Sequence, residues 1–304
     1  MANKTICFGE MLWDVIDDEE YIGGAPFNVA AHMKKLNLDS TLISRLGEDR
    51  RGERAFRRLT ELGINEQYIQ FDSYHPTGWV EVNIKKQDAP SYIIKEGVAW
   101  DHIVLDKNLE RFLKNNKLDF FYFGTLAQRN DVSRNTLAKI LNIIDADNIF
   151  LDINIRQDYF NKDIIEKSLR TADILKLNNE ETEILSRLLY NNVQKDKELC
   201  QLLKKDYNLN IICITRGGEG SSVFFREEYR NISGYKVEVV DTIGAGDAFS
   251  AGFIYLLSCG KDPLQAAKFG NYLGAFVAGK RSSVPSYKRK KIINDYNPGN
   301  LYSN

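Results

Sequence analysis

Short runs rich in β-forming residues alternate with helical patterns along most of the chain, and this alternation constrains the fold more than any other feature. The candidate strands are residues 5–9, 41–45, 119–124, 148–153, 173–177 and 210–215, and the candidate helices are 26–36, 52–62, 131–145, 179–190 and 196–206. The strand runs are continuously apolar, which is typical of strands that are buried on both faces. The pattern therefore predicts an α/β fold with a mostly parallel sheet covered by helices on both sides.

Residues 69–95 interrupt this alternation. They contain two runs of alternating apolar and polar residues, TGWVEVNI and PSYIIK, which are separated by the turn-rich segment KKQDAP, and no helical pattern lies between them. Alternation of this kind predicts an antiparallel hairpin with one solvated face. We expect this hairpin to form a flap attached to the sheet domain.

Composition limits the class of protein. The chain has 304 residues, of which 43% are hydrophobic and 27% charged, as expected for a globular protein with one large domain or two small ones. Its 41 basic and 42 acidic residues leave no basic excess, which disfavours a nucleic-acid partner. We expect no membrane partner, because no apolar run is long enough to span a bilayer. The four scattered cysteines predict reduced thiols and a cytoplasmic protein.

Several kinds of catalytic chemistry lack the necessary residues. The three histidines are far apart, and neither HExxH nor GxSxG occurs. Residues 274–280 (GAFVAGK) match most of a phosphate loop, but Arg281 stands where Ser or Thr should follow, and the segment ends a predicted helix. We therefore reject a phosphate loop there. The basic run at 288–291 is interpreted as a solvated surface.

The segment 241–247, DTIGAGD, precedes a strongly apolar helix. Gly244 and Gly246 allow backbone conformations that other residues avoid, and the amides at a helix start favour an anion such as phosphate. Asp247 would then stand beside the phosphate and could accept a proton from an attacking hydroxyl. The alternative is a turn in which Asp247 stabilises its helix start and Asp241 ends a strand.

The sequence DTIGAGDAFSAGF resembles the C-terminal signature of the PfkB, or ribokinase-like, family of sugar kinases. The resemblance implies that Gly244, Ala245 and Gly246 form an anion hole with Asp247, and that Asp247 is the catalytic base. It also implies a ribokinase-like three-layer α/β/α sandwich with a mostly parallel central sheet and a small β-sheet lid. We expect residues 1–304 to form a single kinase domain, with the lid built from about 14–24 and 69–100.

Other segments resemble the family's sugar-binding parts. GEMLWD (9–14) and GGAPFNVAAHMKKL (23–36) are similar to segments that bind the sugar, and the second is typical of the fructokinase branch. Asp14 and Asn28 suit the hydroxyls of an uncharged sugar, and Gly23 and Gly24 permit a close approach. LDINIRQDYF (151–160) resembles a substrate-binding segment, and alternation predicts that Asp152, Asn154 and Arg156 share one face of a strand.

The resemblance also implies a nucleotide site. In KLNNEETEIL, Asn178 and Glu181 match the family's N-x-x-E, which organises magnesium-bound water and the nucleotide phosphates. The local alternative is an N-cap followed by an acidic first helical turn. The other expected nucleotide contacts are Thr215, Gly217, Gly220, Asn271 and Gly274. The cofactors implied are ATP and Mg²⁺. A K⁺ requirement stays open, because residues 279–287 follow the family's small-residue run only loosely.

The sequence therefore predicts an ATP-dependent sugar kinase, with fructose as the substrate and fructose 6-phosphate as the product. The alternatives are a 2-keto-3-deoxygluconate kinase, in which Arg156 would bind the substrate carboxylate, another family member such as a ribokinase, and a sugar-binding regulatory protein without activity. The expected partners are a small-molecule sugar and ATP, and a homodimer formed through the lid stays open.

Overall fold

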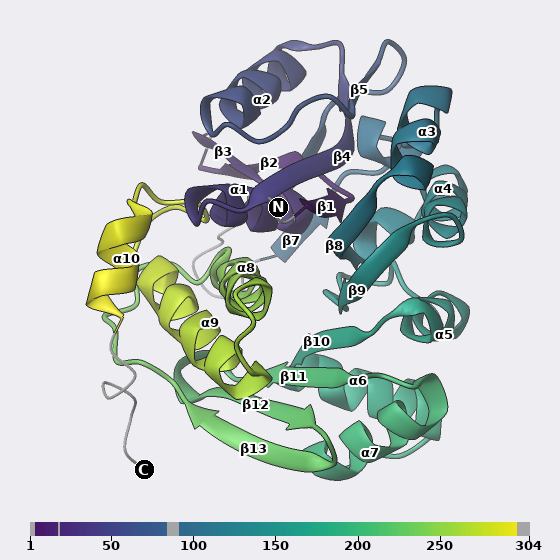
Figure 1. Ribbon diagram of the computed structural model, residues 1–304. Coiled ribbons are helices and arrows are strands. Elements are labelled where there is room, and N and C mark those ends of the chain that lie inside the picture. Colours follow the sequence, from purple (N-terminus) through teal and green to yellow (C-terminus); the bar gives the residue numbers. More distant parts are fainter. Residues whose placement is uncertain (1–3, 18, 84–90, 297–304) are drawn as a thin grey trace.

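The computed structural model of the protein describes residues 4–17, 19–83 and 91–296. Within these ranges nine strands form one main sheet (Figure 1). Their order across the sheet is β13 (Glu228–Ser233), β12 (Gly220–Phe225), β11 (Ile211–Thr215), β10 (Ile174–Asn178), β9 (Asp145–Asp152), β8 (Lys117–Gly124), β1 (Lys4–Phe8), β4 (Asp39–Gly47) and β5 (Ile69–Asp72). The pairs from β11 to β5 are parallel, and β12 and β13 are antiparallel. The predicted mostly parallel sheet is confirmed.

Helices cover both faces of this sheet, so the fold has the three layers that were predicted (Figure 1). One face carries α1 (Ala25–Lys35), α2 (Arg50–Glu61), α8 (Ala245–Ser258), α9 (Pro263–Ala278) and α10 (Arg289–Asp295). The other face carries α3 (Lys107–Asn115), α4 (Asp131–Leu141), α5 (Lys162–Thr171), α6 (Asn179–Tyr190) and α7 (Asp196–Tyr207). The strands of the main sheet present apolar side chains on both faces. Each face therefore packs against its helices in an apolar core of its own.

Three of these helices, α3, α5 and α10, were missed in the sequence, although α3 and α5 each carry a start signal. Asp106 caps α3 by accepting hydrogen bonds from the amides of Asn108 and Leu109. Asn161 caps α5 in the same way through the amide of Ile164. A search for capping residues ahead of short amphipathic stretches would have found both helices.

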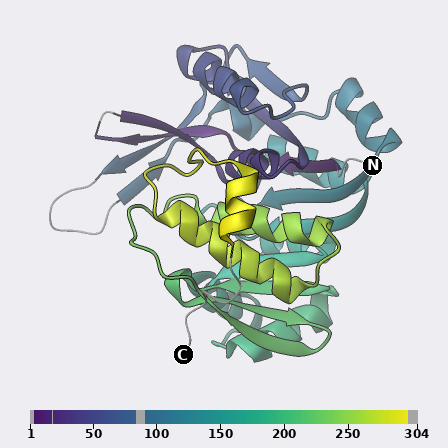
Figure 2. The ribbon, with the colours of Figure 1, turned by 60° about the vertical axis from the view of Figure 1, so that its left-hand side comes forward.

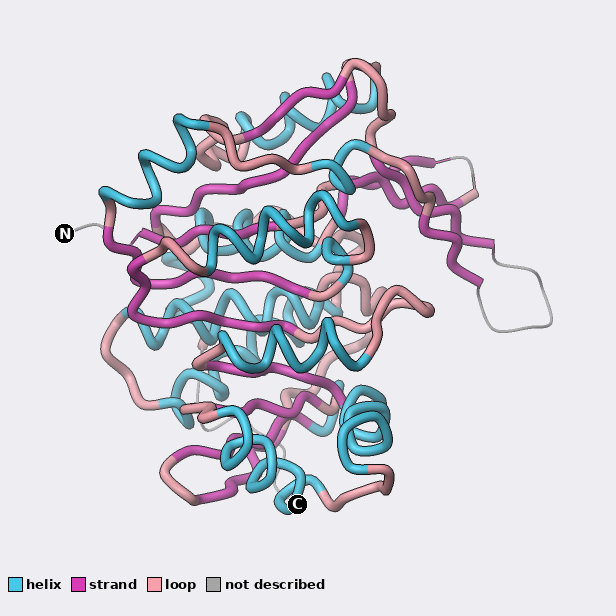
Figure 3. Tube along the Cα trace, turned by 90° about the vertical axis from the view of Figure 1, so that its right-hand side faces the viewer, coloured by secondary structure: helices cyan, strands magenta, loops and turns pink. Residues whose placement is uncertain are grey.

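A separate four-stranded sheet, which we call the lid, projects beyond the main sheet (Figures 2 and 3). Its order is β3 (Glu19–Gly23), β2 (Leu12–Ile16), β6 (Gly78–Asn83) and β7 (Ser91–Ile94). The β6–β7 pair is the predicted antiparallel hairpin, and its turn KKQDAP lies outside the described residues. Residues 69–72, which we had assigned to the lid, instead form β5 and pair with β4 in the main sheet.

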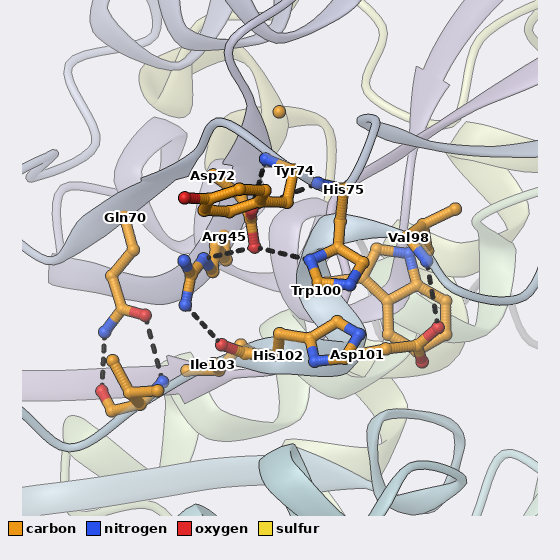
Figure 4. A network of polar contacts seen from close by, with 12 residues as sticks. Arg45, Gln70, Asp72, Tyr74, His75, Val98, Trp100, Asp101, His102 and Ile103 are labelled. Atoms are coloured by element: carbon orange, nitrogen blue, oxygen red, sulfur yellow. Dashed lines mark hydrogen bonds and ion pairs between the residues drawn. The ribbon is translucent and has the colours of Figure 1, made fainter.

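Two histidines stack where the chain enters and leaves the lid (Figure 4). His75 lies in the segment between β5 and β6, and His102 ends the short 3-10 helix η1 (Ala99–His102) that follows β7. Their ring centroids are 3.7 Å apart, and the planes of the two rings are nearly parallel. The contact therefore joins the two segments that connect β6 and β7 of the lid to the rest of the fold.

A buried carboxylate anchors this contact. Asp72 accepts hydrogen bonds from the amides of Tyr74 and His75 and from the His75 ring at 3.0 Å, and it forms an ion pair with Arg45 Nε at 2.9 Å (Figure 4). Burial alone would raise the pKa of Asp72, but these donors outweigh it and lower the pKa to about 2. Arg45 also donates to the carbonyl of His102 at 2.7 Å. Burial is the largest cause that lowers the pKa of His102, and the charge of His75 is the next largest.

The lid connection should therefore loosen in acid. Because the folded state lowers the pKa of His102 below 6.5, the stability that this residue contributes is complete above that value and is lost as the pH falls. Relative to the intrinsic rate at each pH, hydrogen exchange of residues 73–77 and 99–102 should quicken as the pH falls from about pH 7.5 to about pH 5.5. His102→Gln should reduce this acceleration, while exchange in α1 serves as the control. An equal acceleration in the variant would contradict the interpretation.

Candidate active site

The first turn of α8 lies at the centre of the candidate site. Gly244 precedes the helix with φ 79°, so it adopts the left-handed conformation that favours glycine. A Cβ added there would lie 2.5 Å from the Cβ of Ser283 and 2.7 Å from its Cα. The helix begins at Ala245, within the DTIGAGD segment rather than after it. Asp247 is consequently the third residue of the helix, among the amides that carry its partial positive charge.

Asp247 does not cap its own helix, because α8 has no side-chain cap. Its Oδ2 accepts a hydrogen bond from the side-chain amide of Asn28 at 2.8 Å. Asn28 is buried on α1, and its Oδ1 in turn lies 3.2 Å from the hydroxyl of Ser283. Asp241 instead stabilises the turn, since its Oδ1 accepts from the amide of Ile243 at 2.9 Å. Asp247 is therefore not an N-cap, and it can stabilise the helix start only through its negative charge in the first turn.

Three carboxyl groups share this region. Burial is the main cause that raises the pKa of Asp247 to about 6, of Asp14 to about 6 and of Glu10 to about 7. The positive charge of Arg156 acts on all three in the opposite direction. The charges of Asp14, Asp247, Arg156 and Glu10 are therefore close enough to influence one another, and sequence reasoning missed Glu10. Glu10 directly follows Gly9 at the end of β1, and a charged residue beside glycine was the available signal.

The diglycine at 23–24 permits close contacts within the protein itself. Gly23 ends β3, and a Cβ there would lie 2.5 Å from Oδ2 of Asp14 on β2. Gly24 has φ 106°, and a Cβ there would collide with the carbonyl oxygen of Glu10. The Glu10 carboxylate accepts from the amide of Ala25 at 3.2 Å, at the start of α1. Both glycines thus bring the lid and α1 against the carboxyl groups of the site.

The segment after β9 departs from the expected strand. β9 ends at Asp152, and Asn154 has φ 44°, which is a left-handed conformation. Asp152 and Asn154 are buried, while Arg156 is exposed. The three side chains therefore do not share one face of a strand, as alternation had predicted. The left-handed turn at Asn154 is what redirects the chain.

Asn178 and Glu181 form a capping box at the start of α6. Asn178 Oδ1 accepts from the amide of Glu181 at 2.9 Å, and Glu181 Oε2 accepts from the amide of Asn178 at 2.7 Å. Glu181 Oε1 also accepts from the amide of Ile155 at 2.9 Å. Burial raises the pKa of Glu181. The local capping alternative is thus observed, and the same carboxylate fixes the turn that leads to Arg156.

The other expected nucleotide contacts lie near the carboxyl ends of β10 and β11 or along α9. Thr215 pairs in register with Asn178, and Gly217 and Gly220 border the short helix η3 (Gly217–Glu219) with φ 53° and 100°. The amide of Asn271 donates to the carbonyls of Ile232 and Ser233, at 3.2 Å each. A Cβ on Gly274 would lie 3.0 Å from the Ala245 carbonyl, so this glycine lets α9 pack against the first turn of α8.

Sequence reasoning missed Lys176, Tyr122 and Ser250, and it assigned Asp152 only to a strand face shared with Asn154 and Arg156. Asp152, Lys176, Tyr122 and Ser250 form a buried polar cluster beneath the first turn of α8. The signal was present as charged residues inside otherwise apolar strands, in the sequences FLDI and ILKL. A buried charge needs a partner, so two such strands predict an ion pair between them.

An open depression of about 420 Å³ lies away from this site, where Gln67, Tyr68, Asp106 and Asn116 contribute to its lining. Gln67, Tyr68 and Asn116 come just before β5 and β8, so they lie at the amino ends of these strands. Ligands of open parallel sheets bind at the carboxyl ends. The depression is therefore not the active site. In the described part of the chain, no helix is both long and apolar enough to span a membrane.

A family model supplies the deciding comparison. The model described as pfkB family carbohydrate kinase matches residues 2–290. The chain belongs to this family. Among curated relatives, the fructokinase of Escherichia coli is 28% identical to the kinase over 270 residues, which cover 85% of each chain.

Solved structures show the same fold. The fructokinase of Vibrio cholerae O395, with fructose, ADP and calcium ion bound, is 22% identical to this chain and has a TM-score of 0.83. The match covers 96% of this chain and 98% of that fructokinase. The aminoimidazole riboside kinase of Salmonella enterica, complexed with aminoimidazole riboside and an ATP analog, is 19% identical with a TM-score of 0.82 and covers 96% and 99%. These TM-scores confirm the ribokinase-like fold of this chain.

Substitution at Gly244 should test the close approach to Ser283. Alanine at φ 79° costs about 1–2 kcal/mol by itself, and its Cβ would also collide with the Ser283 backbone. Gly260→Ala is a matched control, because Gly260 has φ 71° and nothing lies within 4 Å of the added Cβ. Thermal unfolding and turnover should show a larger stability loss and about a 10²-fold loss of activity for Gly244→Ala only. Equal effects of the two variants would show that conformation alone matters.

Proposed function

We propose that the kinase, acting as one domain over residues 1–304, transfers the γ-phosphoryl group of ATP to the 6-hydroxyl of fructose. The observation that carries this proposal is the place of Asp247. Its carboxyl lies in the first turn of α8, beside the glycine turn, and is held by Asn28. A proton acceptor next to a helix start is what transfer of a phosphoryl group to a hydroxyl requires.

Each part of the site then has a role in the reaction. Asp247 accepts the proton of the attacking hydroxyl, and the Asn28 amide keeps its Oδ2 oriented. The backbone amides of Gly244, Ala245 and Gly246 stabilise the negative charge that spreads over the transferred group. Asp14 lies on lid strand β2, so closure of the lid would bring a hydroxyl acceptor to the sugar and exclude water.

Nucleotide and metal would bind on the side of β10, β11 and α9, where Asn178, Thr215, Gly217, Gly220, Asn271 and Gly274 lie. Mg²⁺ supplies charge neutralisation for the phosphates when it is bound. Among the described residues, no three His, Cys, Asp or Glu side chains gather as a metal site. Glu181 uses both oxygens for backbone amides, so it fits a role through metal-bound water rather than direct ligation.

Fructose is preferred because the GGAPFNVA segment is of the fructokinase type and because the relatives above include fructokinases that cover most of this chain. Arg156 keeps 2-keto-3-deoxygluconate as the second candidate, since it is exposed and its positive charge acts on Glu10 and Asp14. A K⁺ requirement, a cytoplasmic location and a homodimer formed through the lid stay predictions.

The role of Asp247 can be tested with Asp247→Asn. Asparagine keeps the shape of the side chain but is not a base, so turnover should fall about 10²-fold or more. Binding of ATP and fructose by calorimetry should persist. Asp262→Asn is the matched control, because Asp262 caps α9 and asparagine caps equally well. In the wild type, kcat/KM should fall below about pH 6, where Asp247 takes up a proton. Near-normal turnover of Asp247→Asn would refute the proposed mechanism.

The choice of sugar can be tested with a panel of acceptors. In a coupled assay of ADP release, fructose should give the highest kcat/KM among fructose, ribose, glucose, tagatose, adenosine and 2-keto-3-deoxygluconate. If 2-keto-3-deoxygluconate is best and Arg156→Ala removes its advantage, the second candidate is correct. If no acceptor is phosphorylated although sugar and ATP bind, the chain is a sugar-binding protein without activity.

A further inference from the structure

A buried ion pair lies directly behind the first turn of α8. Lys176 on β10 is 6% exposed and Asp152 on β9 is 1% exposed. The lysine Nζ is 3.0 Å from Oδ1 and 3.2 Å from Oδ2 of the aspartate. Burial of two charges is costly, and such pairs are often replaceable by apolar residues without loss of stability. Stability is therefore a weak explanation for this pair.

Hydrogen bonds connect the pair to α8. Oδ2 of Asp152 accepts from the hydroxyl of Tyr122 at 3.1 Å. The hydroxyl of Ser250 lies 3.0 Å from the same oxygen and 3.1 Å from the carbonyl oxygen of Gly246. Asp152 is thus linked, through one serine, to the residue that precedes Asp247.

Lys176 approaches the same turn directly. A Cβ added to Gly246 would lie only 3.3 Å from Nζ of Lys176, and apart from its chain neighbours and the backbone of α8 no other heavy atom of the described residues lies within 4 Å of it. The ammonium group therefore faces the glycine of the anion hole without an intervening side chain. Because this region is buried, a charge there acts more strongly than it would in water.

The two charges act on Asp247 in opposite directions. Burial is the largest cause of its raised pKa, and hydrogen bonding by Asn28 lowers the pKa. Asp152 raises the pKa of Asp247, whereas Lys176 lowers it. The charged or titratable groups that face Asp247 from the surrounding elements are Glu10, Asp14, Tyr122, Asp152, Arg156 and Lys176.

We propose that Lys176 and Asp152 are positioning residues, which together set the charge of the Asp247 carboxyl and hold the first turn of α8. The ammonium group favours the carboxylate form that accepts a proton, and Asp152 limits this effect while it fixes the lysine and the turn. The importance of this charge for catalysis rests on the proposed function, but the charge itself can be measured separately.

The direct experiment follows the ionisation of Asp247. The protein is labelled with ¹³C at the aspartate side-chain carboxyl carbons, and Asp247→Asn identifies the Asp247 resonance. Its titration midpoint is then measured in the wild type, Lys176→Met, Asp152→Asn and the double variant. Lys176→Met should raise the midpoint by about 0.5–1 pH unit, Asp152→Asn should lower it by a similar amount, and the double variant should lie between them.

The control is a second buried ion pair that lies away from α8. Arg129 and Asp101 are joined at 2.7 Å, and their side chains are 4% and 2% exposed. Arg129→Met should lower the melting temperature without moving the Asp247 midpoint. If Lys176→Met does not fold, Lys176→Gln gives the same comparison with a polar, uncharged side chain.

The outcomes separate the two proposals. Opposite shifts of the midpoint support the positioning role, and a matching displacement of the acid limb of kcat/KM extends it to catalysis. Unmoved midpoints, shifts in one common direction, or an equal shift in Arg129→Met would overturn it. Because the titration does not depend on turnover, it can succeed even if Asp247→Asn proves active, in which case only the proposed mechanism fails.

Discussion

The arrangement of the site depends on the close packing of Gly244 against Ser283. No side chain fits between them, so the segment that follows α9 lies directly on the start of α8. His32 holds this segment in place, because its Nε2 lies 2.8 Å from the Ser283 carbonyl, which can only accept a hydrogen bond, and its Nδ1 lies 2.8 Å from the Tyr287 hydroxyl. Asn28, which lies on α1 together with His32, then donates a hydrogen bond to Asp247. One steric constraint thus aligns three segments that are far apart in the sequence.

The lid is coupled to this arrangement by short connections. Its strand β3 ends at Gly23, and the next residue packs on the Glu10 carbonyl at the start of α1. At the other end of the lid, Thr77 donates to Asp49 at the start of α2 through both its amide, at 2.7 Å, and its hydroxyl, at 2.8 Å. Movement of the lid would therefore shift the starts of α1 and α2, and Asn28 lies in the first turn of α1.

Charge in the site is balanced by opposing effects. Burial raises the pKa values of Glu10, Asp14 and Asp247, while Arg156 and Lys176 lower that of Asp247. Values of about 6 to 7 mean that protons remove part of the negative charge near neutral pH. In the proposed function, less repulsion would then oppose the phosphate at the helix start, and the Asp247 carboxyl would still accept a proton from the attacking hydroxyl.

The sequence by itself determined the layered α/β architecture and the glycine turn before α8, because apolar periodicity and local glycine chemistry are short-range properties. It also contained Asp247, Asn28 and Asp14, but not their separation in space. Only the tertiary structure decided that β5 belongs to the main sheet, that Asn154 turns the chain out of its strand, and that Asp152 meets Lys176 beneath Gly246. Strand order and the packing of distant segments decide such contacts, and a linear pattern does not specify which buried charge faces which partner.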